Sequence, residues 1–222
     1  MKRIFLFSLL FLLCSGYGFS QEKKYSTFYY QRASLFEALP VHSNDIVFLG
    51  NSITNGCEWS ELFADSRVKN RGISGDIAAG VYDRLDPILK GKPAKIFLLI
   101  GINDLARGTS ADSIVYQIGR IVEKIRKESP ATHLYLQSLL PVTDHYKLFE
   151  GHTSRGRLVP VINEQLKQLA AREQITYIDL YARFVDPSTG KMNIAYTNDG
   201  LHLLGKGYLI WRDLVKPYID EK

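Results

Sequence analysis

Short apolar runs alternate with amphipathic segments along most of the chain. Four runs have the length of a strand and are almost continuously hydrophobic, as strands buried on both faces of a parallel sheet are. They cover residues 46–49, 96–100, 134–136 and 175–178. Residues 68–71 are more polar and are predicted to form a further, more exposed strand.

The segments between these runs have the spacing of amphipathic helices, with apolar residues recurring on one face. One stripe consists of Ile114, Ile118, Ile121, Val122 and Ile125, and a second of Val161, Ile162, Leu166, Leu169 and Ala170. The first helix is expected to end at Ser129-Pro130, and residues 27–39 are expected to form a lead-in helix. Strands that alternate with helices predict a parallel sheet covered on both faces. With no repeat or Pro/Gly-rich linker, residues 21–222 are expected to form a single α/β domain.

The first residues of the chain have the pattern of a secretory signal peptide. Two basic residues precede a short apolar run over residues 4–13, and small residues follow. The run is shorter than the roughly 20 residues that a membrane-spanning helix needs. We therefore expect residues 1–20 to be a signal peptide cleaved after Ser20, with export to the periplasm or the medium. Cys14 lies where a lipoprotein cysteine would, but the large Leu13 before it disfavours a lipid anchor.

Composition and charge exclude several classes of protein. The 222 residues are 45% hydrophobic and 23% charged, which is the balance of a globular protein rather than of a disordered or fibrous chain. Cleavage of the signal would remove Lys2 and Arg3 and lower the formal net charge from +5 to about +3. That excess is small and scattered, so nucleic-acid binding is not expected.

Cysteine and histidine usage gives no sign of a disulfide or a metal site. After cleavage Cys57 would be the one cysteine left, so no intramolecular disulfide is expected. Neither paired cysteines nor a His-Glu-x-x-His pattern occurs. We therefore expect neither a metal nor a cofactor.

A serine follows the first predicted strand directly, in Gly50-Asn51-Ser52. A serine hydroxyl is a weak nucleophile until a base takes its proton, so it needs a histidine that an acid orients. Asp199 and His202 are three residues apart in one predicted turn, a spacing that lets the carboxylate reach Nδ1 of the imidazole. These three residues are candidate catalytic groups, although each alone also suits a turn or a helix cap. Cys57 is a rival nucleophile, but its small size favours a buried packing role.

Two further turns follow the second and third predicted strands. The backbone amide of Gly75 and the side-chain amide of Asn103 are candidate donors to an oxyanion. The alternative is that Gly75 serves a tight turn and that Asn103 caps a helix. Because the carboxyl ends of parallel strands meet at one edge of a sheet, these turns are expected to lie together there with the serine and histidine turns.

Taken in their order along the chain, the four segments that contain these candidate residues resemble the motifs of the SGNH hydrolases, also called GDSL-type esterases and lipases. The successive blocks of that family are matched by Ser52, by Gly75, by Asn103, and by Asp199 with His202. Asn51 stands where the family usually has aspartate, which puts the local hydrogen bonding in doubt but leaves the nucleophile in place. The matched blocks extend over residues 50–202.

The resemblance implies a flavodoxin-like, three-layer α/β/α sandwich with about five parallel strands, and a metal-free serine esterase. It implies that Ser52 attacks an ester carbonyl, that His202 takes and returns the proton, and that Asp199 orients His202. The backbone amides of Ser52 and Gly75 and the side chain of Asn103 would stabilise the oxyanion. Members of the family include acetyl-carbohydrate esterases, lysophospholipases and thioesterases.

A polar, cationic stretch over residues 143–157 is expected to lie above the carboxyl edge of the sheet. It is either a substrate loop, with Arg155 and Arg157 as candidate contacts, or a solvated loop. Together with export, it favours the removal of acetyl or other short acyl groups from a carbohydrate such as O-acetylated sialic acid or a polysaccharide. A lysophospholipase or platelet-activating-factor-type acetylhydrolase, and an inactive glycan-binding module, remain alternatives. The sequence does not indicate an oligomeric state.

Overall fold

A sheet of five parallel strands, in the order β2-β1-β3-β4-β5, forms the centre of the computed structural model, which describes residues 24–221. The strands are β1 (Ile46–Gly50), β2 (Val68–Gly72), β3 (Lys95–Leu99), β4 (His133–Gln137) and β5 (Thr176–Ile178). All four neighbouring pairs are parallel, as predicted. The predicted signal peptide, with Cys14, lies outside the described residues.

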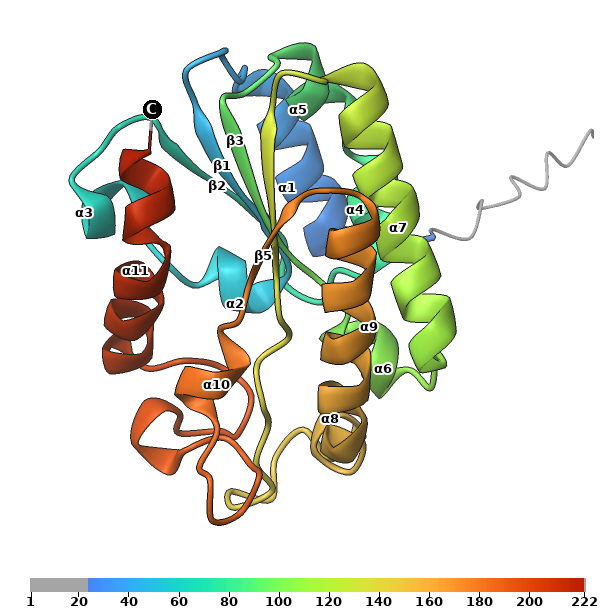
Figure 1. Ribbon diagram of the computed structural model, residues 1–222, viewed down its shortest axis with the longest axis vertical. Coiled ribbons are helices and arrows are strands. Elements are labelled where there is room, and N and C mark those ends of the chain that lie inside the picture. The colour runs from blue at the N-terminus through green and yellow to red at the C-terminus, as the bar shows by residue number, and fades with distance from the viewer. Residues whose placement is uncertain (1–23, 222) are drawn as a thin grey trace, which may run out of the picture.

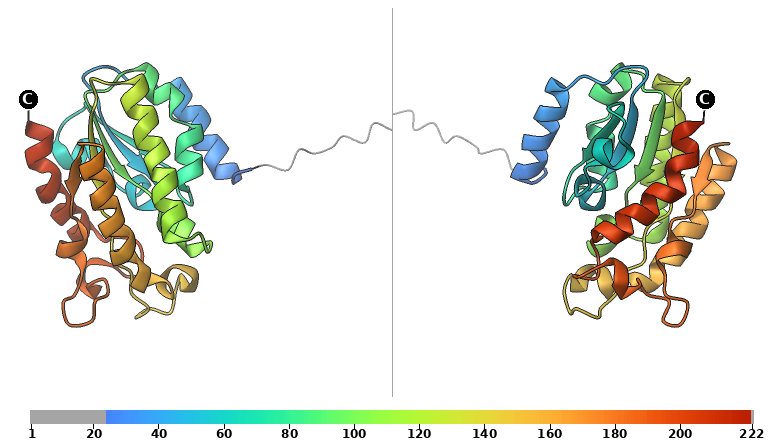
Figure 2. Two further views of the ribbon diagram at one scale, coloured as in Figure 1. Left: turned by 45° about the vertical axis from the view of Figure 1, so that its right-hand side comes forward. Right: turned by 90° about the vertical axis from the view of Figure 1, so that its left-hand side faces the viewer.

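Helices cover both faces of the sheet, which is therefore the middle of three layers (Figures 1 and 2). Figure 1 shows α7 (Ala111–Glu128) and α9 (Val159–Arg172) on one side of the sheet, and α3 (Trp59–Phe63) and α11 (Gly205–Asp220) on the other. The remaining helices are α1 (Thr27–Ala38), α2 (Ser52–Asn55), α4 (Ala78–Asp83), α5 (Asp86–Lys90), α6 (Ile102–Ala106), α8 (Glu150–Thr153) and α10 (Tyr181–Phe184), with single 3₁₀ turns at η1 (Gly156–Leu158) and η2 (Ile194–Tyr196). The predicted three-layer α/β fold is confirmed. Between residues 24 and 221, none of the helices combines the length and the apolar character needed to span a membrane.

Aromatic side chains fill the layer between the sheet and helices α3 and α11. Phe48 of β1 and Phe97 of β3 are register partners, and their rings stack with centroids 4.9 Å apart. Trp59 of α3 stacks on Phe48 at 3.9 Å, and Trp211 of α11 meets Trp59 edge-on at 4.8 Å. Trp211 also donates its indole N–H to Oε1 of buried Gln137 at 2.7 Å, so its polar atom is satisfied. This packing fixes α11 against the sheet.

The helix predicted around residues 114–125 matches α7, and all five residues of its stripe are buried. In α9 the prediction is wrong at one position. Val161 is 49% exposed, and Val159 is buried in its place. The helix begins at Val159, so the buried face follows residues 159, 162, 166 and 169–170, and position 161 points away from it.

The strand order places the switch point of the sheet at the carboxyl ends of β1 and β3. The chain leaves β1 toward β2 on one side and later returns to β3 on the other. At such a switch point the connections diverge, and open α/β sheets bind their ligands there. Ser52 follows β1 and Asn103 follows β3, so both lie at this point. Figure 1 shows α2, α6, α8 and α10 near these ends of the strands.

Candidate active site

Ser52 is the first residue of α2, a single helical turn that follows β1 directly. Asn51 caps this turn because its Oδ1 accepts the backbone N–H of Ile53 at 3.0 Å. The amide oxygen of Asn51 thus makes a hydrogen bond that an aspartate could also make. The capping bond of the turn is therefore kept with asparagine, whereas Nδ2 of the fully buried Asn51 has no hydrogen-bond partner within residues 24–221.

Side chains from distant elements hold the α2 turn in place. Tyr208 of α11 donates its hydroxyl to the carbonyl of Ile53 at 2.9 Å, and the Trp59 indole donates to the carbonyl of Thr54 at 2.8 Å. Gly72, at the end of β2, lets the α2 backbone approach closely, because a methyl group there would meet backbone atoms of α2. Ser52 is therefore presented on a rigid support rather than on a mobile loop.

Ser52, His202 and Asp199 form a continuous chain of hydrogen bonds. Nδ1 of His202 lies 2.7 Å from Oδ2 of Asp199, and Nε2 of His202 lies 2.9 Å from Oγ of Ser52. A carboxylate can only accept, so Nδ1 carries the proton and Nε2 accepts from the serine hydroxyl. This is the tautomer in which the imidazole can remove a proton from Ser52.

Asp199 is held as a carboxylate. Burial would raise the pKa of Asp199, but the backbone N–H groups of Leu201 and His202 donate to its Oδ1, each at 2.8 Å, and lower the pKa below its usual value. Its contribution to the free energy of unfolding is therefore lost only as the pH falls through that lowered pKa. At neutral pH the carboxylate is charged and faces the imidazole.

The backbone N–H groups of Ser52 and Gly75 are free to donate to a bound oxyanion beside the Ser52–His202–Asp199 hydrogen bonds. Within residues 24–221, neither N–H donates to another protein group. Gly75 has φ +79°, a conformation that costs glycine little, and a side chain at this position would meet open space. Backbone conformation, rather than crowding, therefore accounts for glycine at this position.

Asn103 lies in α6 and is 8% exposed. Its Nδ2 donates one proton to the carbonyl of Asp76 at 2.8 Å, which leaves the second proton for another acceptor. The next residue, Asp104, accepts the N–H of Ala78 at the start of α4. These two contacts tie the turn that contains Gly75 to helix α6.

A buried ion pair supports the same turn from beneath. Nε of Arg84 lies 2.9 Å from Oδ2 of Asp76, and the two side chains are 5% and 0% exposed. The guanidinium also donates to the carbonyl of Arg71, one residue before the end of β2, and to the carbonyl of Gly50, the last residue of β1. Burial raises the pKa of Asp76 to about 6, although Arg84 opposes that rise. Arg84 thus joins the serine turn and the glycine turn through one side chain.

Replacement of Arg84 by methionine is expected to lower the free energy of unfolding by about 3–5 kcal/mol, because the Asp76 carboxylate would remain buried without its partner. Urea denaturation measures the change. The matched control is Arg126→Met, which breaks the exposed pair with Glu173 and should cost less than about 1 kcal/mol. Equal, small losses in the two variants would contradict a structural role for the buried pair.

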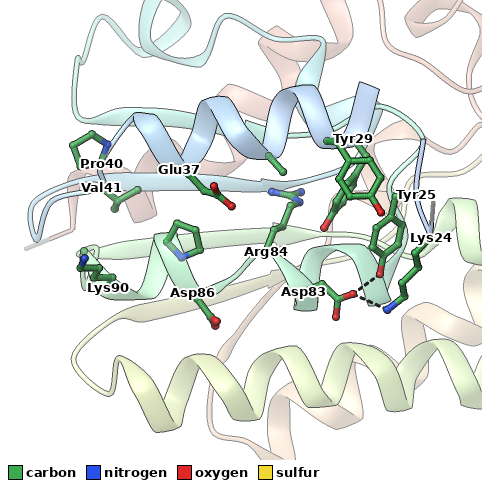
Figure 3. A pocket seen from close by; sticks show the side chains of 14 residues that line it. Lys24, Tyr25, Tyr29, Glu37, Pro40, Val41, Asp83, Arg84, Asp86 and Lys90 are labelled. Atoms are coloured by element: carbon green, nitrogen blue, oxygen red, sulfur yellow. Dashed lines mark hydrogen bonds and ion pairs between the residues drawn. The ribbon is translucent and has the colours of Figure 1, made fainter. Parts of the chain in front are cut away.

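Arg84 also borders a hollow of 900 Å³ between α1 and α5 (Figure 3). At one end of the hollow, Nζ of Lys24 and the hydroxyl of Tyr25 each donate to Oδ2 of Asp83 at 2.7 Å. Tyr29 stands between them and Arg84, and donates its hydroxyl to the carbonyl of Gly80 at 2.8 Å. None of the candidate catalytic residues lines this hollow.

The stretch predicted as an irregular loop over residues 143–157 is partly helical, since it contains α8 and the start of η1. Two residues of this stretch, Phe149 and His152, contact the site, and the sequence analysis predicted a role for neither. Nε2 of His152 lies 2.9 Å from Oδ1 of Asn103, and the Phe149 ring packs edge-on against His202 with centroids 5.2 Å apart. The one available signal was a histidine among polar residues. Such a pattern does not say where the ring points.

Arg155 and Arg157, the candidate substrate contacts, are both exposed. Neither guanidinium has a hydrogen-bond or ion-pair partner within residues 24–221. Arg155 lies over Gly108, just after α6. Arg107, the residue before Gly108, donates a guanidinium N–H to the carbonyl of Gly75 at 3.0 Å. The rim beside α6 is therefore cationic.

Cys57, the rival nucleophile, is 6% exposed. Burial raises the pKa of its thiol to about 12. A thiol with that pKa is protonated at neutral pH and is a poor nucleophile. The packing role expected for Cys57 is confirmed.

Comparison with known proteins identifies the family. Residues 48–210 match the GDSL-like lipase/acylhydrolase family over nearly three-quarters of the chain. The chain belongs to this family. It is a carboxylic ester hydrolase. Its family therefore does not support the alternative of an inactive glycan-binding module.

Relatives of this GDSL-like hydrolase include the bovine (Bos taurus) platelet-activating factor acetylhydrolase IB subunit alpha1, which is 28% identical over 171 residues, or 74% of this chain and 70% of that protein. A GDSL-like lipase from Bacteroides thetaiotaomicron is similar in structure, with a TM-score of 0.74 and 25% identity over 86% of this chain and 97% of that one. The acetyl xylan esterase AlAXEase shares the fold, with a TM-score of 0.66 and 20% identity over 78% of this chain and 98% of that one.

Proposed function

We propose that this hydrolase is a serine esterase that removes acetyl or other short acyl groups from a carbohydrate. The observation that carries the proposal is the hydrogen-bonded chain from Ser52 through His202 to Asp199, at the switch point of the sheet. The proposed chemistry uses these three side chains and a water molecule.

In the first half of the reaction, Oγ of Ser52 attacks the acyl carbon as its proton moves to Nε2 of His202. The negative charge that develops on the carbonyl oxygen is met by the amides of Ser52 and Gly75 and by the second Nδ2 proton of Asn103. Asp199 stabilises the imidazolium. His202 then gives its proton to the departing sugar oxygen, which leaves an acyl group on Ser52.

In the second half, a water molecule gives a proton to His202 and attacks the acyl carbon. The same donors hold the oxyanion of the second tetrahedral intermediate. Its collapse returns the proton to Oγ of Ser52 and releases the carboxylic acid. The net reaction is hydrolysis of one ester bond, with the protein regenerated.

The surroundings of the serine favour a small acyl group on a polar alcohol. The His202 side chain is 32% exposed, so the site is open to a bulky leaving group. The Phe149 ring packs edge-on against His202, and we propose that it limits the space for a long acyl chain there. The cationic rim at Arg107 and Arg155 suits a hydroxyl-rich or acidic sugar better than an apolar chain.

Rates on p-nitrophenyl acetate, butyrate and octanoate test the acyl preference. We expect acetate to be hydrolysed with the largest kcat/KM, and an O-acetylated sugar to be a better substrate than the aryl ester. A preference for octanoate would contradict the proposal and favour a lysophospholipase. The similarity to a platelet-activating factor acetylhydrolase supports a second candidate function, a platelet-activating-factor-type acetylhydrolase.

Arg155 and Arg157 are proposed to contact an acidic sugar such as O-acetylated sialic acid. Replacing either by alanine should raise KM for an acidic acetyl sugar and leave KM for neutral p-nitrophenyl acetate unchanged. A matched control is Arg172→Ala, at the far end of α9. Equal changes in KM on both substrates would remove the proposed contact.

A further inference from the structure

His152 reaches Asn103 from a segment 49 residues further along the chain. The Asn103 amide is oriented by its two partners: Nδ2 faces the Asp76 carbonyl at 2.8 Å, which can only accept, and Oδ1 faces His152 Nε2 at 2.9 Å. Oδ1 is an acceptor, so His152 must be the donor in this hydrogen bond. The imidazole therefore carries a proton on Nε2.

The surroundings of His152 keep its ring neutral. Burial lowers the pKa of His152, and the nearby His202 and Arg107 lower it further. A neutral ring with its proton on Nε2 has a bare Nδ1, and it adds no positive charge beside His202. His152 is thus a neutral donor, in contrast to His202, whose Nε2 accepts from Ser52.

The segment that carries His152 is built against the site. Its short helix α8 starts after Phe149, which has φ +52° and ψ +44°, a left-handed backbone that is uncommon for a bulky residue. In this conformation the Phe149 ring lies edge-on to both histidines, with centroids 5.8 Å from His152 and 5.2 Å from His202. Gly151 of the same helix lies close to Ala106 of α6. The imidazole is therefore held between α6 and the Phe149 ring.

We infer that His152 is a positioning residue of the oxyanion hole, whose Nε2–H holds the Asn103 amide with its second Nδ2 proton directed at the oxyanion. This inference rests on the proposed serine esterase function. Asn103 can keep its bond to Asp76 while its amide rotates about that contact. The bond from His152 adds the second fixed point that defines the amide plane. Electrostatic stabilisation of an oxyanion depends on donors that are oriented before the charge develops.

Two substitutions separate the donor from the shape of the side chain. His152→Phe keeps a ring without a donor, and His152→Gln keeps an N–H donor at similar reach. On p-nitrophenyl acetate we expect His152→Phe to lower kcat about 10- to 100-fold, less than the 10²–10³-fold loss expected for Asn103→Ala, with KM changed by less than about threefold. His152→Gln should restore most of kcat. His145→Phe, in the same segment but exposed, should leave kcat unchanged.

A double-mutant cycle tests whether His152 acts through Asn103. In the Asn103→Ala background, His152→Phe should cause no further loss of kcat, since the amide that it positions is gone. A wild-type kcat in His152→Phe would overturn the inference. Fully additive losses in the double variant would also overturn it, because His152 would then act on its own.

A measurement without turnover keeps this inference separate from the proposed function. The side-chain ¹⁵N–H signals of Asn103 report its hydrogen bonds whether or not the protein hydrolyses an ester. These signals should move, and their amide exchange should speed up, in His152→Phe, and both should return toward wild type in His152→Gln. Unchanged signals in His152→Phe would overturn the positioning role. A wild-type protein that hydrolyses no ester, but whose Asn103 signals respond in this way, would overturn the proposed function and leave the hydrogen bond supported.

Discussion

Replacing Ser52 by alanine is expected to lower kcat for p-nitrophenyl acetate by about 10⁴-fold or more, while KM changes little. The hydroxyl is the one group that forms the covalent bond in the proposed mechanism, and its hydrogen bond to Nε2 of His202 at 2.9 Å is the path for its proton. The substituted side chain is small and α2 is capped by Asn51, so the fold should be retained. Initial rates, with circular dichroism to check folding, measure the effect.

Two control variants make the result specific to Ser52. Ser60→Ala, on the exposed face of α3, should leave kcat unchanged. Cys57→Ala removes the nearby thiol, whose pKa is raised to about 12 by burial, and should retain the activity of the wild type. Activity that survives in Ser52→Ala and disappears in Cys57→Ala would contradict the serine mechanism.

The second large effect is expected for Asp199→Asn, with a loss of about 10⁴-fold in kcat. Oδ1 of Asp199 accepts two backbone N–H groups at 2.8 Å, so the oxygen of the substituted amide must take that place. Its NH₂ group is then left facing Nδ1 of His202, which becomes an acceptor. The imidazole proton moves to Nε2, which points at Ser52, and the base can no longer take the serine proton.

The geometry of the site should survive this substitution, since the amide is nearly isosteric with the carboxylate. Equal melting temperatures for wild type and variant, together with the loss of kcat, would separate the tautomer effect from unfolding. Asp213→Asn, an exposed position on α11, provides the matched control. A kcat within about tenfold of the wild type would show that the orientation of His202 does not depend on the Asp199 charge.

Much of the fold is readable from the sequence because each signal for it is local. Buried parallel strands are apolar on both faces, so the runs around Phe48 and Phe97 stand out without knowledge of their neighbours. The stripe of α7 has the same property, since its spacing alone defines the buried face. At Val161 a shift in the start of α9 moves the buried face, and the sequence pattern does not resolve such a shift.

Candidate site residues were also found where the evidence is local. Ser52, Gly75 and Asn103 each follow a recognisable strand, and Asp199 stands at a fixed spacing before His202. The hydrogen bond between Ser52 and His202 joins residues 150 positions apart. Family resemblance predicted that pairing, but its geometry depends on the packing of the sheet and α11.

The sequence by itself determined the elements, the turns at the ends of the strands and the residue types in those turns, because secondary structure and turn chemistry depend on neighbours along the chain. Only the tertiary structure decided that His152 donates to Asn103, that Phe149 covers both histidines, and that Arg84 joins two turns beneath the serine. The physical reason is that a polar side chain has the same sequence signature whether it faces water or a buried partner. Its role follows from what the folded chain places opposite it.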